Sequence, residues 1–326
     1  MTFYVLTMFI LHSCQVVRDV TDTVERHFSK PLPLKNMNKN PVDDTTDFSV
    51  FWVGHATTLI QIEDKVILTD PFFTNNIAAV LRRFNEPGIN IGDLDQCDMI
   101  LISHSHMDHL NLGSLGMLEE RFPGTALLFP EGVEQFLPDY DLELYRFKTA
   151  SDKNNKYIGE TKIINGVKVT SVKAYHWAGR YGLDGKLWKM GGSCGYIIEY
   201  KGKTVYYSGD TSYNEEFSRY LGDNYNIDLA LIPVIYSDDD KECYNDVHLY
   251  PKGLHKISDD TKAVTSIPIH YGTFTDPEKQ YPVLDSMLRY NDSYKEKVKI
   301  LKIGDKIILK DTYISKLKNE ENKNKD

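Results

Sequence analysis

Four residues whose side chains commonly bind metal ions lie within one short segment of the chain. His104, His106, Asp108 and His109 follow the apolar run Asp98–Ser103, which is typical of a strand buried on both faces. His104 and His106 are two residues apart, so in extended backbone their side chains point to the same side. Imidazole and carboxylate groups together suit zinc and related ions. The spacing therefore favours a metal site over a polar, histidine-rich turn in front of a helix.

Further side chains of the same kinds stand where other predicted strands end. His176 follows the strand predicted at Val167–Ala174, and Asp210 follows the one predicted at Thr204–Ser208. His270 ends a third predicted strand. Taken singly, such a histidine is usually a core residue and such an aspartate a helix N-cap. Because α/β proteins place ligands at the ends of their strands, the three together favour one shared site with the first cluster.

These residues must be positioned by alternating strands and helices. Strands are predicted at Phe48–Val53, Thr57–Ile62, Lys65–Thr69, Asp98–Ser103, Val167–Ala174, Gly195–Tyr200, Thr204–Ser208, Leu229–Val234, Val264–His270, Ile300–Ile303 and Lys306–Leu309. Helices are predicted at Leu112–Arg121, Tyr213–Leu221, Pro251–Ser258 and Pro277–Tyr290. The pattern predicts an α/β fold in which two β-sheets pack between helical layers, as one domain over residues 48–314.

Composition narrows the class of protein. The 326 residues include 38 Lys and Arg against 47 Asp and Glu, and the formal net charge of −9 disfavours binding along nucleic acid. The four cysteines are far apart and do not suggest a disulfide framework. No apolar run approaches the ~20 residues of a membrane span.

The two ends of the sequence differ from its body. Residues 1–47 are predicted to be an arm and linker, and Ser315–Asp326 a polar tail. The apolar run Phe3–Leu11 precedes Cys14, but no basic residue precedes the run. A lipoprotein anchored through Cys14, a retained hydrophobic arm and an unremarkable start remain alternatives. The location is accordingly cytoplasmic or membrane-associated.

The order of the candidate ligands resembles that of the metallo-β-lactamase superfamily of dinuclear hydrolases. Five motifs narrow the likeness to the branch of N-acyl-phosphatidylethanolamine-hydrolysing phospholipase D and its bacterial relatives; they are Trp52–Thr58, Leu68–Pro71, His176–Arg180, Ser208–Thr211 and Ile269–Phe274. The resemblance covers about residues 48–290. It implies an αβ/βα four-layer sandwich. The same branch includes sugar-phosphate lactonases, so the resemblance only suggests a substrate.

The resemblance also implies roles for the candidate ligands. His104, His106 and His176 would bind one Zn²⁺. Asp108, His109 and His270 would bind a second, with Asp210 between the two ions. Mn²⁺ or Fe²⁺ could replace zinc. A hydroxide shared by both ions is the expected nucleophile, and Asp108 is expected to orient it.

The resemblance and the sequence point to further candidate residues less firmly. His248 matches a family histidine that contacts the scissile phosphate, although it also precedes a predicted helix. His55 is expected to support the site rather than bind metal. Arg180 could bind a phosphate or form a surface ion pair. Arg82 and Arg83 follow the apolar run 77–81, which would suit either a lipid substrate or a short amphipathic core helix.

Three functions follow from this reading. The first is a zinc-dependent phosphodiesterase of phospholipase D type, with a phospholipid or small-molecule substrate and peripheral membrane contact. The second is a lactonase or other small-molecule hydrolase that uses the same ions. The third is a membrane-anchored, metal-stabilised binding protein. The oligomeric state, the exact substrate and the metal in the cell do not follow from the sequence.

Overall fold

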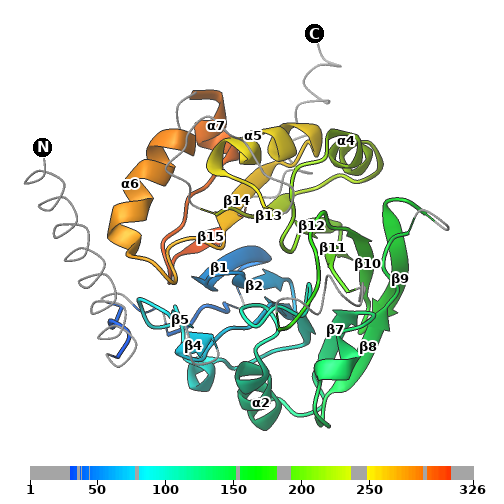
Figure 1. The fold of residues 1–326 in the computed structure, drawn as a ribbon, viewed down its shortest axis with the longest axis vertical. Coiled ribbons are helices and arrows are strands. Elements are labelled where there is room, and N and C mark those ends of the chain that lie inside the picture. The colour runs from blue at the N-terminus through cyan, green and yellow to red at the C-terminus, as the bar shows by residue number, and fades with distance from the viewer. Residues whose placement is uncertain are drawn as a thin grey trace, which may run out of the picture.

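The computed structural model describes most of the predicted domain. The described residues are 30–34, 37, 39–43, 45–77, 81–151, 155–181, 192–235, 248–288 and 292–309. Two large β-sheets lie at the centre, with α4, α5, α6 and α7 on one side and α2 on the opposite side (Figure 1). The expected four-layer αβ/βα sandwich is therefore confirmed.

The first sheet has seven strands in the order β15-β1-β2-β3-β6-β7-β8. They are β1 (Phe48–Gly54), β2 (Thr57–Ile62), β3 (Lys65–Thr69), β6 (Met99–Leu101), β7 (Ala126–Pro130), β8 (Glu143–Phe147) and β15 (Lys306–Ile308). The four strands from β3 to β8 in this order are parallel. Their carboxyl ends therefore lie at one edge of the sheet.

The second sheet has six strands in the order β14-β13-β12-β11-β10-β9. They are β9 (Ile158–Ile164), β10 (Val167–Lys173), β11 (Cys194–Tyr200), β12 (Lys203–Tyr207), β13 (Leu229–Pro233) and β14 (Thr265–Ile269). β12, β13 and β14 are parallel, and β10 runs in the same direction as β12 because both are antiparallel to β11. Four strands of this sheet thus end at a common edge.

The helices cover the outer faces of the sheets. They are α2 (Leu112–Arg121), α4 (Glu215–Asn224), α5 (Pro251–Asp260), α6 (Pro277–Leu288) and α7 (Asp292–Lys297), with short 3₁₀ turns η1 (Ile91–Asp93) and η2 (Glu134–Phe136). Asparagine side chains cap α2 and α4, since Asn111 and Asn214 each accept a backbone hydrogen bond from the first turn. None of the helices formed by the described residues is long and apolar enough to cross a membrane.

The core has two parts because the strands are buried on both faces. Along β1, Val50 and Trp52 pack into the layer shared with the second sheet, whereas Phe51 and Val53 pack into a separate cluster with α2. This alternation follows from the two-residue repeat of a strand.

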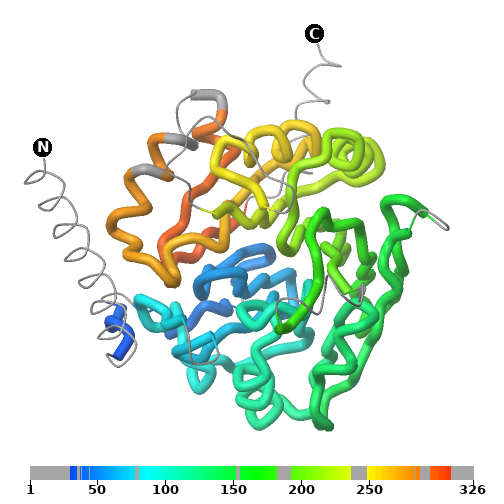
Figure 2. Tube along the Cα trace, in the orientation of Figure 1, coloured from blue at the N-terminus to red at the C-terminus, as the bar shows by residue number. Residues whose placement is uncertain are grey.

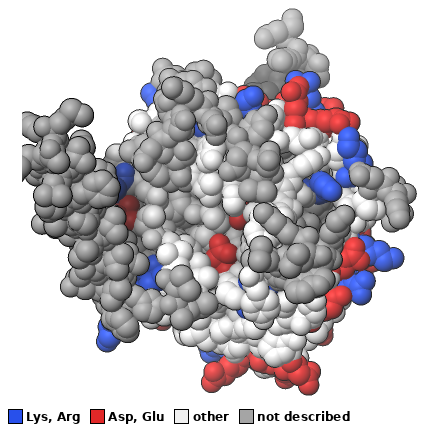
Figure 3. Space-filling model, in the orientation of Figure 1, with Lys and Arg blue, Asp and Glu red and all other residues white. Residues whose placement is uncertain are grey.

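The surface of the domain is charged. On the face seen in Figure 3, Lys and Arg side chains and Asp and Glu side chains are interspersed around the edge.

Several sequence predictions about elements are wrong. No strand forms at 300–303; the nearby chain makes only an isolated bridge between Ser266 and Val298. The two described ends of the run 77–81 belong to strands, because β4 (Asn76–Ile77) and β5 (Leu81–Arg82) pair as a small antiparallel sheet. The sequence reading also missed the strands β4, β5, β7, β8 and β9, the helix α7 and the two 3₁₀ turns.

The segment before β1 lies along the outside of the domain. Leu32 bridges Asn85 in parallel, which places residues 30–34 beside the chain that follows β5 (Figure 2). The predicted signal or lipoprotein segment with Cys14 lies outside the described residues, as does the polar tail.

Candidate metal centre

The seven predicted ligands come from both sheets and meet at one edge. The first four follow β6 of the first sheet. His176, Asp210 and His270 follow β10, β12 and β14 of the second sheet. The parallel direction of these strands brings their ends together, so the chain folds its donors into the space between the sheets.

Three histidines form one group. Nε2 of His104 lies 2.7 Å from Nδ1 of His106, and Nε2 of His176 lies 3.2 Å from the same nitrogen. Around a tetrahedral zinc ion with Zn–N bonds of ~2.0–2.1 Å, neighbouring nitrogens are roughly 3.3 Å apart. The three ring nitrogens therefore lie close enough to share one ion.

A second group forms around Asp108. Its Oδ2 lies 3.6 Å from Nε2 of His109 and 3.8 Å from Nε2 of His270. His55, from the turn between β1 and β2, approaches the same oxygen at 3.0 Å. Candidate ligand atoms of Asp108, His109, His270 and His55 all lie within 4.8 Å of one another.

Asp210 lies between the two groups. Its Oδ2 is 3.3 Å from Nε2 of His109 and 3.4 Å from Nε2 of His270, and 3.9 Å from Nε2 of His176. One carboxylate oxygen therefore faces donors of both groups.

The hydrogen bonds behind the donors fix where their protons lie. Nδ1 of His109 is 2.6 Å from Asp70, whose carboxylate accepts that proton, so in the neutral imidazole Nε2 of His109 is left with a lone pair. The hydroxyl of Ser103 donates to Asp70 and therefore accepts from Nδ1 of His104 at 2.9 Å. The Nε2 lone pairs of both histidines thus point into the centre.

A cation fits this donor set better than a hydrogen-bond network does. Among the described residues, Nε2 of His109, Nε2 of His270 and Oδ1 of Asp210 are buried and have no hydrogen-bond partner. Buried polar atoms without partners are costly. When these imidazoles are neutral, their lone pairs face carboxylate oxygens and other lone pairs at 2.7–3.9 Å, and a cation between them would satisfy both.

The charges in the two groups shift the pKa values in opposite directions. Burial and the neighbouring histidines lower the pKa of His104, and that of His106 falls to about 4. Burial also acts to lower the pKa of His270, but the carboxylates of Asp210 and Asp108 outweigh it and raise this pKa to about 9. The pKa of His109 is likewise raised well above its usual value by Asp210, Asp108 and Asp70, against burial.

Asp70 is a functional residue that the sequence reading did not assign. It is fully buried after β3 and accepts hydrogen bonds from Ser103, His109 and the Tyr207 hydroxyl. Through His109 directly and His104 by way of Ser103, it holds one donor of each group. The signal was present, because Asp70 follows the end of a strand as the other donors do.

The predicted substrate residues have different surroundings. The His248 side chain is 28% exposed, and its Nε2 lies 3.7 Å from Oδ2 of Asp210, so it lies beside the centre. Nη1 of Arg180 donates to the backbone oxygens of Ser105 and Leu110 at 3.2 and 2.9 Å. Arg180 thus supports the loop that contains the first four donors.

The two arginines near β5 do not behave alike. Arg83 is 1% exposed and donates to the backbone oxygens of Phe72 and Asn85 at 2.9 and 2.7 Å. These contacts show that Arg83 supports the chain around β5, and its substrate contact stays a prediction. Arg82 lies half-buried on β5, and its substrate contact stays a prediction.

Aromatic rings flank the donors. The ring of Trp177 is 4.4 Å from that of His106, and the ring of Phe274 is 4.9 Å from that of His55. Tyr181 is 72% exposed and contacts Phe136 edge to face.

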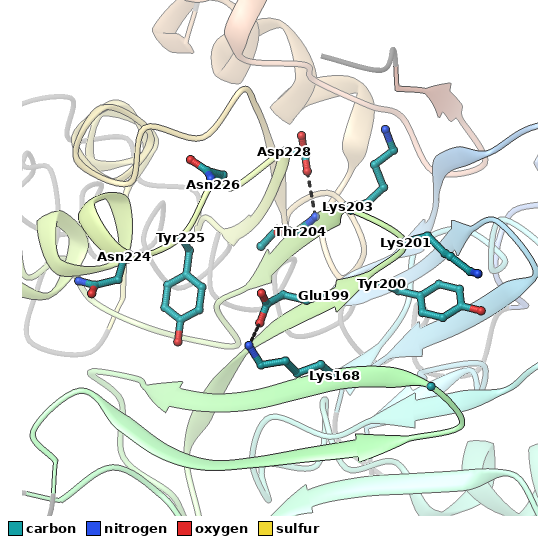
Figure 4. Close-up of a pocket in the computed structure, with 12 residues that line it drawn as sticks. Lys168, Glu199, Tyr200, Lys201, Lys203, Thr204, Asn224, Tyr225, Asn226 and Asp228 are labelled. Atoms are coloured by element: carbon teal, nitrogen blue, oxygen red, sulfur yellow. Dashed lines mark hydrogen bonds and ion pairs between the residues drawn. The ribbon is translucent and has the colours of Figure 1, made fainter. Parts of the chain in front are cut away.

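A large cavity lies away from the seven candidate donors. It measures about 610 Å³ and is lined by residues such as Lys168, Glu199 and Tyr225, where β12 and β13 begin. Three of its charged side chains interact with the protein itself: Lys168 pairs with Glu199 at 2.7 Å, and Asp228 accepts from the backbone of Thr204 at 2.9 Å (Figure 4). None of the seven donors lines it.

Comparison with known proteins supports a metal-dependent hydrolase. A metal-dependent hydrolase of the UPF0173 family from Pelotomaculum thermopropionicum is 26% identical over 260 residues, covering 80% of this chain and 99% of that protein. The N-acyl-phosphatidylethanolamine-hydrolyzing phospholipase D 1 of Caenorhabditis elegans is 25% identical over 255 residues, covering 74% and 69%.

Solved structures share the fold. An isothiocyanate hydrolase from Delia radicum gut bacteria superposes with a TM-score of 0.58 at 15% identity, covering 79% of this chain and 98% of that one. A metallo hydrolase from Ignicoccus hospitalis gives a TM-score of 0.53 at 19% identity, covering 80% and 97%.

The family assignment rests on more than half of the chain. The beta-lactamase superfamily domain matches residues 65–271, a range that contains all seven donors. The described donors also converge as a metal site requires. The chain therefore belongs to the metallo-β-lactamase superfamily, as a metal-dependent hydrolase.

Proposed function

We propose that this protein is a phosphodiesterase of phospholipase D type that uses two zinc ions. Its substrates would be N-acyl-phosphatidylethanolamine-like phospholipids, which it would hydrolyse to phosphatidic acid and an N-acylethanolamine. Contact with a membrane surface would give it access to them.

The position of Asp210 is the observation that favours two ions over one. Its Oδ2 lies 3.3–3.9 Å from donor nitrogens of both groups. A single ion would use one group and leave the donors of the other buried without a partner. His104, His106 and His176 would hold the first ion, and Asp108, His109 and His270 the second, with Asp210 shared.

The types of donor support zinc. Five of the seven are imidazoles and two are carboxylates, a set that suits zinc better than the oxygen-rich sites of Mg²⁺ or Ca²⁺. When bound, two such ions lower the pKa of water towards ~7 and stabilise negative charge on phosphoryl oxygens. Mn²⁺ and Fe²⁺ remain alternatives that metal analysis would distinguish.

The residues of the chain divide the remaining work. The Asp108 side chain is 26% exposed, against 3% for Asp210, so Asp108 can orient the attacking water on the open side of the centre. His248 is also partly exposed and adjacent to Asp210, where it can donate to a phosphoryl or leaving-group oxygen. Asp70 keeps the donor lone pairs directed inward.

The substrate class is supported by the surroundings of the centre and by one relative. Trp177 and Phe274 place aromatic rings on both sides of the donors, which suits a substrate with an apolar part. The Caenorhabditis elegans relative is named for hydrolysis of N-acyl-phosphatidylethanolamine. The identity of 25% is low, so the substrate needs a direct assay.

The test is hydrolysis by the purified full chain after zinc loading. N-acyl-phosphatidylethanolamine in mixed vesicles and a sugar-phosphate lactone are offered separately, and products are measured by mass spectrometry. The Asp210→Asn variant serves as the control for contaminating activity. We expect phosphatidic acid from the vesicles with the wild-type chain alone.

Two other outcomes of this test would support one of the alternative functions. Lactone hydrolysis without phospholipid hydrolysis would contradict the phosphodiesterase and support a small-molecule hydrolase. Binding of lipid vesicles without turnover of any substrate would support a metal-stabilised binding protein instead.

A further inference from the structure

His55 lies outside the seven donors but touches two of them. It occupies the turn between β1 and β2, and its side chain is only 2% exposed. Its Nε2 lies 3.0 Å from Oδ2 of Asp108, the same oxygen that faces His109 and His270. The Asp108 side chain itself is 26% exposed on a turn, so this contact restrains a carboxylate that would otherwise be free to rotate.

The ring of His55 also packs against His270. Their ring centroids are 3.9 Å apart with an angle of 39° between the planes. Phe274 closes the other side with an edge contact at 4.9 Å. One side chain thus limits the movement of two donors in the Asp108 group.

The backbone of His55 is held firmly in an unfavourable conformation. Its φ is +52°, a region that costs a non-glycine residue about 1–2 kcal/mol. The carbonyl accepts from the Trp52 indole and from the backbone of His270, both at 2.9 Å, and its N–H donates to the Thr273 hydroxyl at 2.6 Å. Such conformations persist where the surroundings determine them and where function depends on them.

The proton on the ring decides between two roles. A carboxylate oxygen only accepts, so Nε2 of His55 must hold a proton in order to bond Asp108. A nitrogen that donates to Asp108 has no lone pair for a metal ion. The 3.0 Å contact therefore makes Nε2 of His55 a donor to Asp108 and not a metal ligand.

We propose that His55 is a positioning residue, which fixes Asp108 and His270 for the second ion without binding that ion itself. This inference rests on the proposed two-ion function. It predicts that His55 governs the affinity of the second ion and leaves the first group, His104, His106 and His176, unaffected.

The test compares zinc binding to full-length variants after metal removal. His55→Gly suits the positive φ and removes the ring, whereas His55→Gln retains an N–H donor. His255→Ala is the matched control, since His255 is a buried histidine of α5 that packs against Tyr294. Stepwise zinc affinities come from calorimetry, and X-ray absorption counts the imidazoles per zinc.

We expect His55→Gly to weaken the second binding step by about 10- to 100-fold and to leave the first step unchanged. His55→Gln should recover most of the affinity, and the imidazole count should match that of the wild type. His255→Ala should leave both steps unchanged.

Three results would overturn the inference. The first is an unaltered second step in His55→Gly. The second is a lower imidazole count in His55→Gln, which would make His55 a ligand. If the wild-type chain binds no second zinc ion, the two-ion function fails and this inference with it. If the wild-type chain binds two zinc ions and His55→Gly binds the second ion with unchanged affinity, only the positioning role of His55 fails.

Discussion

The hydrogen bonds behind the donors explain how single residues prepare the centre. Asp70 accepts from Ser103, His109 and Tyr207 and is fully shielded from solvent. Because one carboxylate fixes the ring orientation of His109 and, through Ser103, that of His104, both groups depend on it. The second-row contacts of metal ligands commonly affect metal affinity by 10- to 100-fold.

His248 tests the division between ligands and substrate contacts. Because His248 lies beside Asp210 at 3.7 Å but is 28% exposed, we expect His248→Ala to keep its zinc and to lose about 100-fold in turnover. Asp210→Asn is the comparison and should lose both zinc and activity. Elemental analysis and initial rates of the two purified variants provide the measurement. Loss of zinc from His248→Ala would mean that His248 is a ligand.

The raised pKa values predict that zinc uptake releases protons. In the metal-free chain the pKa of His270 is about 9, so this imidazole is protonated at pH 7, and the pKa of His109 is shifted in the same direction. Zinc binds only neutral imidazole, so binding at pH 7 should expel protons from the chain. Because fewer protons remain to be displaced, apparent affinity should rise from pH 7 to pH 9. Calorimetry in buffers of different ionisation heat measures both effects; zinc binding without proton release at pH 7 would contradict them.

At the scale of elements, the strand that presents Asp210 needs a close approach to the first sheet. Gly209 has φ +56°, and a Cβ there would lie 2.6 Å from the Cβ of Ser103 and 2.9 Å from the oxygen of Cys194. Both neighbours lie at strand ends beside the donors. Glycine at this position therefore lets the edges of the two sheets meet.

This contact gives a prediction about Gly209→Ala. We expect a loss of about 1–3 kcal/mol in the free energy of unfolding, together with weaker zinc binding, because Ser103 and Asp210 are displaced. Gly116→Ala in α2 is the control: its Cβ would meet no atom within 4 Å, so it should stabilise the chain by about 0.5–1 kcal/mol. Urea denaturation of both variants measures whether the free energy of unfolding falls in Gly209→Ala and rises in Gly116→Ala. Equal changes in the two variants would refute the close approach at Gly209.

The elements also show what the sequence could predict. The seven candidate donors could be predicted because the first four follow β6 and the other three follow the ends of β10, β12 and β14. β8 and β9 were missed because they are edge strands with exposed and charged residues, so they lack a continuous apolar signal. The burial of Arg83 was also beyond sequence reasoning, since charged residues are rarely buried and its partners are backbone oxygens.

At the scale of the whole molecule, the donors join the two sheets. One sheet contributes the four donors after β6, and the other contributes the three after β10, β12 and β14. Bound ions would add to the apolar contacts and hydrogen bonds, such as that from Tyr207 to Asp70, which already join the two sheets. Metal binding and the stability of the sandwich should therefore be coupled.

Chelation should accordingly lower the melting temperature. Zinc in excess of 1,000 times its dissociation constant stabilises the folded state by about 4 kcal/mol for each independent site. We expect a chelator to lower the Tm of the wild-type chain by several degrees and that of Asp210→Asn by less. Scanning calorimetry at fixed protein concentration compares them; an unchanged wild-type Tm would show that the ions do not support the fold.

The metal stoichiometry of the purified full chain is the most direct test of the two-ion centre. Elemental analysis after zinc saturation and removal of loosely bound ions should give two zinc ions per wild-type chain. The double variant Asp108→Ala, His270→Ala should retain one zinc ion, held by His104, His106 and His176. A wild-type ratio of one, or of none, would contradict the account.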